Sequence, residues 1–300
     1  MFDLQGYLIE RQRQVESWLE ASMPAETTPP AVLHQAMRYS VFSGGKRLRP
    51  VLCMAAAEAV GARTDAARLP AVAVELLHTY TLVHDDLPCM DDDELRRGKP
   101  TCHIAFGEAN AVLAGDALQT LAFEVLAQAQ PPSRYPPAQL IAELAAAAGS
   151  RGVVGGQVED LAASERGGVS LEHVEFIHEH KTADLFRASL RMGAIAGDAT
   201  AADLRDLSDY GACIGRAFQV VDDLIDAADD SATDAPCTAQ PRNPERGSLT
   251  CLSVLTKGKA RNLAVRLIGD AKRAVASFPP ARVEPLLALA DFVLSRAPGP

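Results

Sequence analysis

Two clusters of acidic residues carry the strongest chemical signal in this 300-residue sequence. The first, Asp85–Glu94, places six carboxylates within ten residues, directly after an apolar run. Alone, it would also fit a solvated acidic loop. At the carboxyl end of a helix, however, the backbone dipole disfavours anions, and like charges repel one another. A hard cation such as Mg²⁺, which prefers oxygen ligands, would relieve that cost. Asp85 and Asp86, which end the apolar run, are therefore candidate metal ligands.

The second cluster lies in the apolar stretch Phe218–Asp226. On a helix, Asp222 and Asp226 share one face at a spacing of four residues, and Gln219 joins them there. Asp223 adds a further carboxylate. A salt-bridged face would explain one such motif, but buried carboxylates are costly unless they are paired or metal-bound. Two such clusters, facing each other across a bundle, would hold Mg²⁺ ions that clamp a diphosphate.

Cationic residues stand in complementary places. The segment Ser43–Pro50 puts Gly44 and Gly45 before Lys46 and Arg49, at the start of an apolar helix. Glycine lets the backbone approach a phosphate, which helix-start amides and cationic side chains can bind. Taken alone, the segment fits a helix-capping surface turn equally well.

Five further residues complete the set of candidates. His78 lies two helical turns before Asp85, where a satisfied core histidine is the simpler interpretation, and Arg96 and Arg97 follow the acidic loop. The two arginines would hold phosphate oxygens or merely balance the acids. Lys181 and Thr182 lie within a helical pattern, where a hydroxyl and backbone carbonyl dipoles can stabilise a positive charge. A surface lysine is the alternative.

Helices must position these residues, because strand-like alternation is nearly absent. Apolar spacing and Pro and Gly breaks predict helices over Ala31–Val41, Leu48–Val60, Ala71–Asp86, Ala109–Ala129, Ala138–Gly149, Leu171–Ala196, Ala202–Asp226, Lys259–Val275 and Val283–Leu294. Without strands, the layer rules leave an all-α helical bundle, which we expect to form a single domain over residues 1–300.

Composition narrows the setting of this bundle. The formal net charge of −10 argues against a nucleic-acid partner, because phosphate contacts need a basic surface. Six scattered cysteines without a CxxC pair indicate reduced thiols. The amino-terminal residues lack a signal-peptide pattern, and no apolar run reaches the roughly 18 residues of a spanning helix. We expect a cytoplasmic protein with no stable membrane insertion.

The motifs together resemble those of the trans-isoprenyl diphosphate synthases, the polyprenyl synthase family, from Leu33 to Arg296. They stand in family order: GGKRLRP (Gly44–Pro50), ELLHTYTLVHDDLPCMDDDELRRGKPTCH (Glu75–His103), GDAL (Gly115–Leu118), GGQVEDL (Gly155–Leu161), HKT (His180–Thr182) and FQVVDDLID (Phe218–Asp226). The resemblance implies an isoprenoid-synthase-type bundle around a central cavity, Mg²⁺ as cofactor, diphosphate substrates and a homodimer.

The resemblance also implies roles for the candidate residues. Mg²⁺ on an allylic diphosphate would be held by the carboxylates Asp85, Asp86, Asp91, Asp222, Asp223 and Asp226. The diphosphate of isopentenyl diphosphate would be bound by Gly45, Lys46, Arg49, His78 and Arg97. The allylic side would comprise Arg96, Lys181, Thr182 and Gln219. The allylic C–O bond would ionise with Mg²⁺ as Lewis acid, and the alkene of isopentenyl diphosphate would attack the cation.

Product length in such enzymes is set just before the first aspartate motif, here by Tyr80 and Thr81. A bulky Tyr80 would form a floor that stops the chain early, which is similar to the bacterial farnesyl diphosphate synthases. A geranylgeranyl product is the second expectation. If Tyr80 instead points into a helix interface, it sets nothing.

One departure keeps other functions open. The tract after Asp226 holds no lysine until Lys257, although the family usually has a lysine-bearing loop there; Arg242 or Arg246 would have to substitute. A non-catalytic regulatory subunit of a heteromeric prenyltransferase is therefore an alternative. A terpene cyclase needs no isopentenyl site, so Lys46, Arg49 and His78 together argue against that function. A plain helical scaffold would leave the charges of the two acidic clusters uncompensated.

Overall fold

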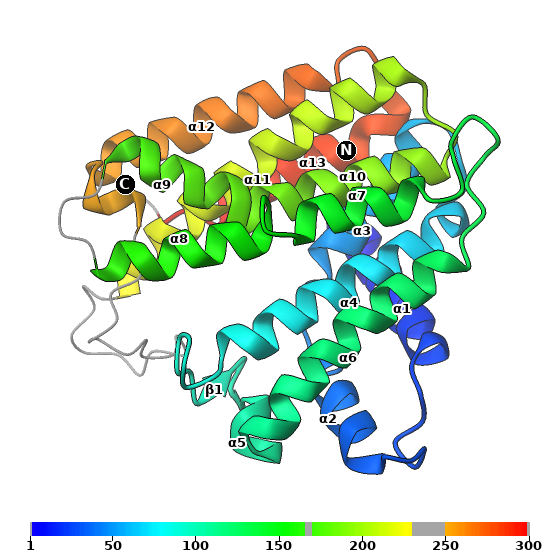
Figure 1. The fold of residues 1–300 in the computed structure, drawn as a ribbon. Coiled ribbons are helices and arrows are strands. Elements are labelled where there is room, and N and C mark those ends of the chain that lie inside the picture. Colours follow the sequence, from blue (N-terminus) through cyan, green and yellow to red (C-terminus); the bar gives the residue numbers. More distant parts are fainter. Residues whose placement is uncertain (1, 166–169, 230–249, 299–300) are drawn as a thin grey trace.

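Helices make up most of the computed structural model, which describes residues 2–165, 170–229 and 250–298 (Figure 1). The longer helices are α1 (Leu4–Ser22), α2 (Ala31–Val41), α3 (Leu48–Ala59), α4 (Arg68–Asp85), α6 (Glu108–Ala127), α7 (Gln139–Ala148), α8 (Val153–Glu165), α10 (Asp184–Ala196), α11 (Ala201–Asp229), α12 (Lys257–Ala274) and α13 (Pro280–Ser295). The shorter ones are η1 (Thr64–Ala67), α5 (Cys102–Phe106), α9 (Leu171–Ile177), η2 (His178–Ala183) and η3 (Cys251–Ser253). The all-α fold expected from the sequence is confirmed.

The only strands in the described ranges form a short antiparallel hairpin, β1 (Leu95–Arg96) and β2 (Lys99–Pro100). Arg97 and Gly98 join them with positive φ angles of 54° and 75°. Such angles at both central positions are typical of a tight hairpin turn. The hairpin directly follows the acidic loop and fixes where its arginines emerge.

Two of the longer helices, α1 and α8, are not predicted from the sequence because their hydrophobic or helix-forming patterns are weak. In α1 only Leu8, Val15 and Leu19 are buried, so a narrow apolar stripe in a polar segment suffices. Helix α8 begins with Gly155 and Gly156 near its first turn, and each glycine disfavours a helix by about 1 kcal/mol relative to alanine. Packing in the tertiary structure overrides that local preference.

The predicted helix Leu171–Ala196 is continuous but not uniform. It comprises α9, the π-helical turn η2 and α10. Single π-helical turns occur often at functional sites. Here η2 carries His178, Lys181 and Thr182, so the irregular turn changes the direction of these side chains relative to a regular helix.

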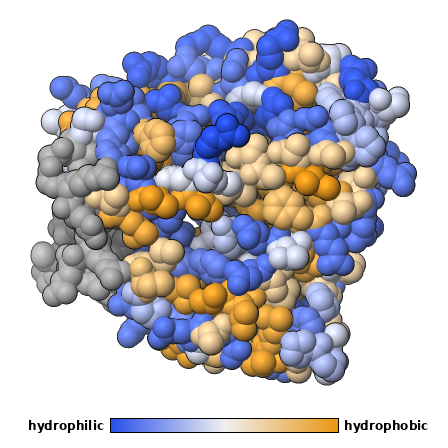
Figure 2. All heavy atoms as spheres, in the orientation of Figure 1, coloured by the Kyte–Doolittle hydropathy of each residue, from blue (hydrophilic) through white to orange (hydrophobic). Residues whose placement is uncertain are grey.

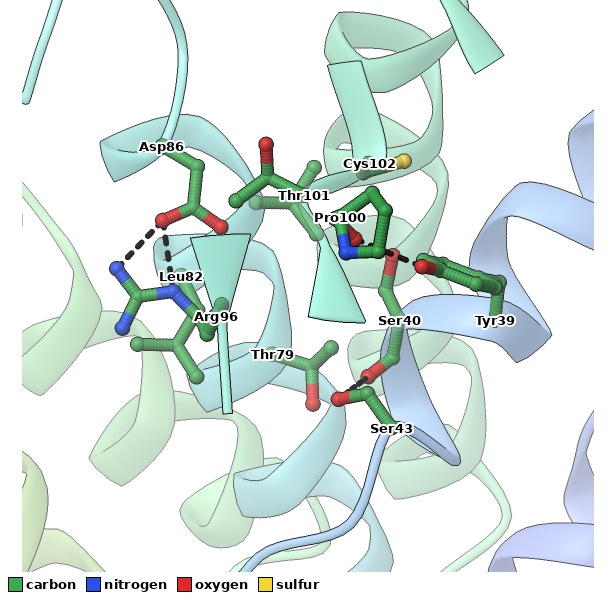
Figure 3. A pocket seen from close by; sticks show the side chains of 11 residues that line it. Tyr39, Ser40, Ser43, Thr79, Leu82, Asp86, Arg96, Pro100, Thr101 and Cys102 are labelled. Atoms are coloured by element: carbon green, nitrogen blue, oxygen red, sulfur yellow. Dashed lines mark hydrogen bonds and ion pairs between the residues drawn. The ribbon is translucent and has the colours of Figure 1, made fainter. Parts of the chain in front are cut away.

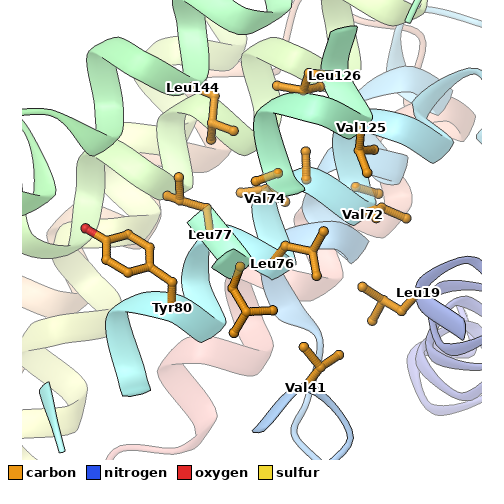
Figure 4. Packing of buried hydrophobic residues seen from close by; sticks show 14 of the residues in the cluster. Leu19, Val41, Val72, Val74, Leu76, Leu77, Tyr80, Val125, Leu126 and Leu144 are labelled. Atoms are coloured by element: carbon orange, nitrogen blue, oxygen red, sulfur yellow. The ribbon is translucent and has the colours of Figure 1, made fainter. Parts of the chain in front are cut away.

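Two hydrophobic clusters share a pair of central helices. One cluster joins α1, α2, α4, α6 and α7 (Figure 4), and the other joins α11, α12 and α13. Helices α3 and α10 contribute to both. They approach closely because Gly193 has no side chain: a Cβ there would lie 1.9 Å from the Cys53 carbonyl oxygen. Nearly every residue of α3 is buried, as its apolar sequence predicts.

The fold brings the two acidic clusters to one side of the molecule. Helices α4 and α11 both end on the left in Figure 1, with η2 packed against α8 and α11. None of the helices in the described residues is long and apolar enough to cross a membrane.

Candidate active site

A cavity of about 340 Å³ opens between the helices that carry the sequence motifs. Its polar lining comes from α3 and α4, through Arg49, His78 and Asp85, and from η2, through Lys181 and Thr182. Its apolar lining comes mainly from Leu82, Met90, Val153, Val154, Val158, Leu161 and Leu185. The cavity thus has a charged end suited to a diphosphate and an apolar part suited to a hydrocarbon.

The first acidic loop folds back on the end of α4. The Asp91 N–H donates to the Asp85 carbonyl oxygen at 2.8 Å, which brings the two residues together. Burial raises the pKa of Asp85 to about 7, with Lys181 opposing the rise and Asp91 adding to it. Burial also raises the pKa of Asp91. Both carboxyl groups are therefore held where ionisation is costly until a cation compensates.

Among the cations, Lys181 has the largest lowering effect on the pKa of both Asp85 and Asp91. Its Nζ lies 2.5 Å from Asp160 Oδ2, and Asp85 and Asp91 also hold its pKa above the ordinary value, although burial opposes this. Asp160 belongs to α8, where Gly156 allows close contact: a Cβ at Gly156 would lie 2.2 Å from the Lys181 backbone nitrogen. The close packing of α8 on η2 therefore places Lys181 beside the acidic loop.

Asp86 has a different environment from its neighbour Asp85. Arg96 Nε donates to Asp86 Oδ1 at 2.7 Å (Figure 3). The Arg96 Nη2 atom also lies 3.3 Å from Asp93 Oδ2. Asp86 lines a separate small pocket together with Thr79 and Ser43. The structure thus pairs two residues for which the sequence predicted separate roles, Asp86 as a metal ligand and Arg96 on the allylic side.

In the second cluster, Asp222 faces a cation from the end of the chain. Arg296, just beyond α13, places Nη2 2.8 Å from Asp222 Oδ1 and stacks its guanidinium carbon 4.8 Å from the centre of the Phe218 ring. Burial nevertheless raises the pKa of Asp222 to about 6, because Arg296 offsets it only in part. Arg296 was not among the predicted site residues. No spacing signal marks it, since it lies 74 positions from its partner.

Asp223 is buried and already accepts from several protein donors. Its oxygens receive the Gln219 amide at 3.1 Å and the Cys251 backbone N–H at 2.7 Å, and His178 Nε2 lies 3.3 Å away. Burial acts to raise the pKa of Asp223, but these neighbours outweigh it and hold the pKa below the ordinary value. Gln219 in turn accepts from the Thr182 hydroxyl at 2.9 Å. Asp226, one turn further along α11, is half-buried.

The glycine-rich loop packs against the hairpin. Arg97 donates to the Gly44 carbonyl oxygen, and Gly45 has φ of 134° and no room for a side chain, since a Cβ would lie 2.5 Å from Arg97 Nη1. Lys46 is exposed at the opposite side of the loop; burial and Arg296 lower its pKa, while Asp222 acts to raise it. The loop thus contacts the hairpin through Gly44 and Gly45 and carries Lys46 within electrostatic reach of Asp222.

Arg49 and His78 form one polar pair on the cavity wall. Arg49 Nη1 donates to His78 Nε2 at 3.0 Å. Burial, followed by the charge of Arg49, lowers the pKa of His78 well below its ordinary value, so the ring is neutral and accepts this hydrogen bond. Burial also lowers the pKa of Arg49 to about 10, which leaves it charged at neutral pH.

Arg47 is a structural residue that the sequence did not single out. It begins α3 with φ of 50° and is buried, and its guanidinium contacts Glu16 of α1 and Glu75 of α4, each at 2.7 Å. It also donates to the Val41 carbonyl oxygen at 2.6 Å. Arg47 therefore anchors the glycine-rich loop to α1, α2 and α4. Its neighbours Lys46 and Arg49 take no part in these contacts.

Tyr80 and Thr81 both line the cavity. Tyr80 is only 7% exposed; in Figure 4 its ring stands at the edge of the packed cluster, away from Leu19 and Val41. It also packs edge-on against His84, with ring centres 5.3 Å apart. The Thr81 hydroxyl donates to the His78 carbonyl oxygen at 2.8 Å. A large aromatic side chain thus borders the cavity five residues before Asp85.

The residues fit a magnesium ion shared with a phosphate ligand. Among the described residues, no three His, Cys, Asp or Glu side chains are close enough to hold a metal by themselves. Mg²⁺ is usually bound in this incomplete way, through one or two carboxylates together with substrate phosphates and water. Asp85 with Asp91 on one side and Asp222 on the other supply such carboxylates. Arg242 and Arg246, the expected lysine substitutes, lie outside the described residues.

Comparison with known proteins agrees with this geometry. A family model described as polyprenyl synthetase matches residues 30–241. The chain belongs to the polyprenyl synthetase family. The trans-prenyl diphosphate synthase resemblance of the motifs is thus confirmed, and the protein is a short-chain prenyltransferase of this family.

Individual relatives align with nearly the whole of this chain. A heterodimeric geranylgeranyl pyrophosphate synthase large subunit 1, chloroplastic, from Arabidopsis thaliana is 43% identical, covering 98% of this chain and 80% of the relative. An FPP/GFPP synthase structure from Zymomonas mobilis has a TM-score of 0.84 at 36% identity, covering 97% and 99%. A geranylgeranyl pyrophosphate synthetase structure from Pyrococcus horikoshii has a TM-score of 0.86 at 30% identity, covering 97% and 98%.

Proposed function

We propose that this polyprenyl synthetase condenses isopentenyl diphosphate with dimethylallyl diphosphate and then geranyl diphosphate, and releases farnesyl diphosphate. The observation that carries the product length is Tyr80, a buried aromatic residue on the cavity wall five residues before Asp85. A growing chain that starts at the acidic clusters meets this ring early. Chain growth then stops because the ring and the packed cluster behind it leave no apolar space.

The binding roles follow from charge and position. Asp85, Asp91 and Asp222 would hold Mg²⁺, which supplies Lewis-acid assistance to the departing allylic diphosphate when bound. On the isopentenyl side, Lys46, Arg49 and Arg97 would bind the other diphosphate, with neutral His78 aligning Arg49. We assign Asp86, Asp226 and Arg96 supporting roles in these two clusters. Gly45 keeps the loop close to Arg97.

The apolar cavity protects the reaction. Thr182 and Lys181 lie where positive charge would develop on the allylic chain, and the surrounding Leu and Val side chains would exclude water from it. No protein nucleophile is needed. We assign the final proton loss to the departing diphosphate as base.

A geranylgeranyl product is the second candidate. The Arabidopsis and Pyrococcus relatives carry that name, whereas the Zymomonas one is named an FPP/GFPP synthase. Names alone do not decide product length, since a few side chains at the cavity wall can change it.

A product assay tests the proposal. Purified protein with Mg²⁺ and labelled isopentenyl diphosphate is offered dimethylallyl, geranyl or farnesyl diphosphate, and dephosphorylated products are resolved by mass. We expect farnesol from the two shorter starters and no use of farnesyl diphosphate. Geranylgeraniol would overturn the length assignment. No elongation with any starter would favour a regulatory subunit.

The Tyr80→Ala variant tests the floor directly. We expect products longer than those of the wild type, because the cavity gains the volume of the ring. Tyr80→Phe is the matched control and should keep the wild-type product, since it keeps the ring. An unchanged product distribution in Tyr80→Ala would show that Tyr80 sets nothing.

We also propose a homodimer in a reducing compartment such as the cytoplasm. Helix α6, which covers most of the predicted helix Ala109–Ala129, exposes Val112 and Leu113 at 40% and 55%. Cys53, Cys102 and Cys251 are free and buried, which is typical of proteins kept reduced.

A further inference from the structure

A chain of hydrogen bonds connects a buried carboxylate to the cavity wall. Asp223 Oδ1 accepts from Gln219 Nε2 at 3.1 Å, and Gln219 Oε1 accepts from the Thr182 hydroxyl at 2.9 Å. Thr182 lines the cavity beside Lys181 and Asp85. Asp223 itself is 2% exposed and does not line the cavity. Hydrogen bonds therefore connect Asp223 to the cavity wall through Gln219 and Thr182.

The direction of each proton along this chain is fixed by chemistry. A carboxylate only accepts hydrogen bonds, so the amide nitrogen of Gln219 must face Asp223. The amide oxygen of Gln219 must then face Thr182. Because this oxygen also only accepts, the Thr182 hydroxyl must use its single proton to donate a hydrogen bond to Gln219. Its lone pairs are left for other contacts, including those within the cavity.

We propose that Asp223 is a positioning residue that sets the polarity of the Thr182 hydroxyl. This rests on the proposed function, in which positive charge develops on the allylic chain beside Thr182. An oxygen that presents lone pairs stabilises such a charge, whereas a hydroxyl proton aimed at the cavity would oppose it. Preorganised dipoles act strongly in a site closed to water.

The same geometry distinguishes Asp223 from its neighbour Asp222. Asp223 Oδ2 accepts from the Cys251 backbone N–H at 2.7 Å, and His178 Nε2 lies 3.3 Å from the same oxygen. Both oxygens of Asp223 thus face protein donors from α11, η2 and η3. Asp222, in contrast, faces Arg296 at the charged end of the site. The two adjacent carboxylates therefore have different tasks, one for the diphosphate and metal and one for the cation.

The variant Asp223→Asn reverses the chain without changing its shape. The Cys251 N–H still needs an acceptor, so the amide oxygen of the new side chain takes the Oδ2 position. Its NH₂ group then faces Gln219, which must turn its own oxygen toward it. The Gln219 nitrogen now donates to Thr182, and the Thr182 proton is released toward the cavity.

The test uses binding as well as turnover. The probes are an allylic diphosphate analogue with an ammonium nitrogen in place of the carbon that becomes cationic, and its neutral carbon counterpart, with Mg²⁺ and titrated by calorimetry. We expect the wild type to prefer the ammonium probe and Asp223→Asn to lose that preference. We also expect kcat to fall on the order of 100-fold, with little change in KM for either diphosphate.

Thr182→Val supplies the decisive comparison because it removes the hydroxyl altogether. Loss of the Thr182 hydroxyl should lower kcat less than a hydroxyl whose proton faces the cavity. The double variant Asp223→Asn/Thr182→Val should therefore have a higher kcat than Asp223→Asn alone, and the same kcat as Thr182→Val. Losses that multiply in the double variant would overturn the proposal, since a merely structural role of Asp223 predicts them.

Asp222→Asn is the matched control. We expect it to raise the Mg²⁺ concentration needed for diphosphate to shift the melting temperature, whereas Asp223→Asn should leave it unchanged. An equal rise in both would make Asp223 a metal ligand and overturn the proposal. A wild type that elongates no starter would sink the proposed function; its preference between the two probes would still decide the role of Asp223.

Discussion

Single residues at this site are held in states that cost the ligand-free protein stability. The pKa of Asp85 is raised to about 7 and that of Asp222 to about 6, because burial outweighs Lys181 and Arg296 respectively. Both cations reduce the cost without removing it. Residual cost of this kind favours the binding of Mg²⁺, since a bound cation relieves it. Stability and function are thus opposed at the same atoms.

Replacing Asp85 by asparagine should therefore stabilise the metal-free protein and abolish turnover. The folded pKa of Asp85 lies above its ordinary unfolded value of about 3.9. Its ionisation thus removes stability as pH rises from near 4 to above 7. We expect the melting temperature of Asp85→Asn to exceed that of the wild type by more at pH 8 than at pH 5.

Asp92 provides the control for that experiment. It lies in the same acidic loop but is exposed, with φ of 57°, a conformation that asparagine also tolerates. Asp92→Asn should leave the melting temperature and its pH dependence close to those of the wild type. A melting temperature for Asp85→Asn that is below the wild type at pH 8 would contradict the prediction.

Much of this residue-scale picture could be predicted from the sequence, and the limits have a physical cause. Short sequence motifs contain the main candidate residues, Asp85, Asp91, Asp222, Lys181 and Thr182. The charge density of the two acidic motifs is unusual by itself. The partners that decide what each group does come from remote segments: Arg296 for Asp222, and Cys251 for Asp223. Periodicity carries no information on such pairs, so the division of tasks within the second cluster required the structure.

At the scale of elements, the site depends on one close helix contact. Helix α8 packs on η2 at Gly156, and the pair Asp160–Lys181 crosses the same contact. The sequence predicts no helix here because the glycines weaken the local signal. The reason for Gly156 is steric and long-range: the backbone of Lys181 occupies the space of a side chain.

A methyl group at Gly156 should disturb both stability and catalysis. Its Cβ would lie 2.2 Å from the Lys181 nitrogen, so α8 must move away. We expect Gly156→Ala to lower the free energy of unfolding by about 1–3 kcal/mol and to reduce kcat, as denaturant titration and the product assay will measure.

The control for this steric effect is Gly258→Ala in α12. A Cβ there meets nothing within 4 Å, so alanine should stabilise the helix by about 0.4–1 kcal/mol. If Gly156→Ala proves as neutral or stabilising as Gly258→Ala, the close contact of α8 with η2 does not govern the site.

The contact of α7 with α10 contains a partly buried ion pair. Glu143 accepts from Arg191 Nε at 2.6 Å and Nη2 at 2.7 Å. Burial opposes the ionised form, but these hydrogen bonds hold the pKa of Glu143 below its ordinary value. A lowered pKa contributes stability that is present above the unfolded value of about 4.3 and is lost below it.

Glu143→Gln should therefore cost about 1–3 kcal/mol of unfolding free energy at pH 7 and progressively less as the pH falls below about 4. Denaturant titration across that range measures the difference between variant and wild type. A difference that stays constant with pH would mean that the pair adds nothing through its charge.

At the scale of the whole molecule, the cavity lies between α3, α4, α8, η2 and α10, beside the charged end of α4. Surface hydrophobicity is also arranged in bands. In Figure 2 apolar residues gather over α7 and α8 and again over α6. Val154 and Val158 of the first band also line the cavity, so this band borders the site. The α6 band, with Val112 and Leu113, does not line the cavity and is exposed for contact with another protein chain.

The α6 band should mediate the proposed homodimer. Leu113 is 55% exposed on a long apolar helix, and exposed apolar patches mark interaction sites. We expect Leu113→Glu to reduce the mass measured by light scattering from that of a dimer to that of a monomer, because a charge would be buried at the interface. Glu124→Gln, a polar change further along α6, is the control and should stay dimeric. A Leu113→Glu protein that remains a dimer would place the interface elsewhere, and a monomeric wild type would leave α6 for a different partner chain.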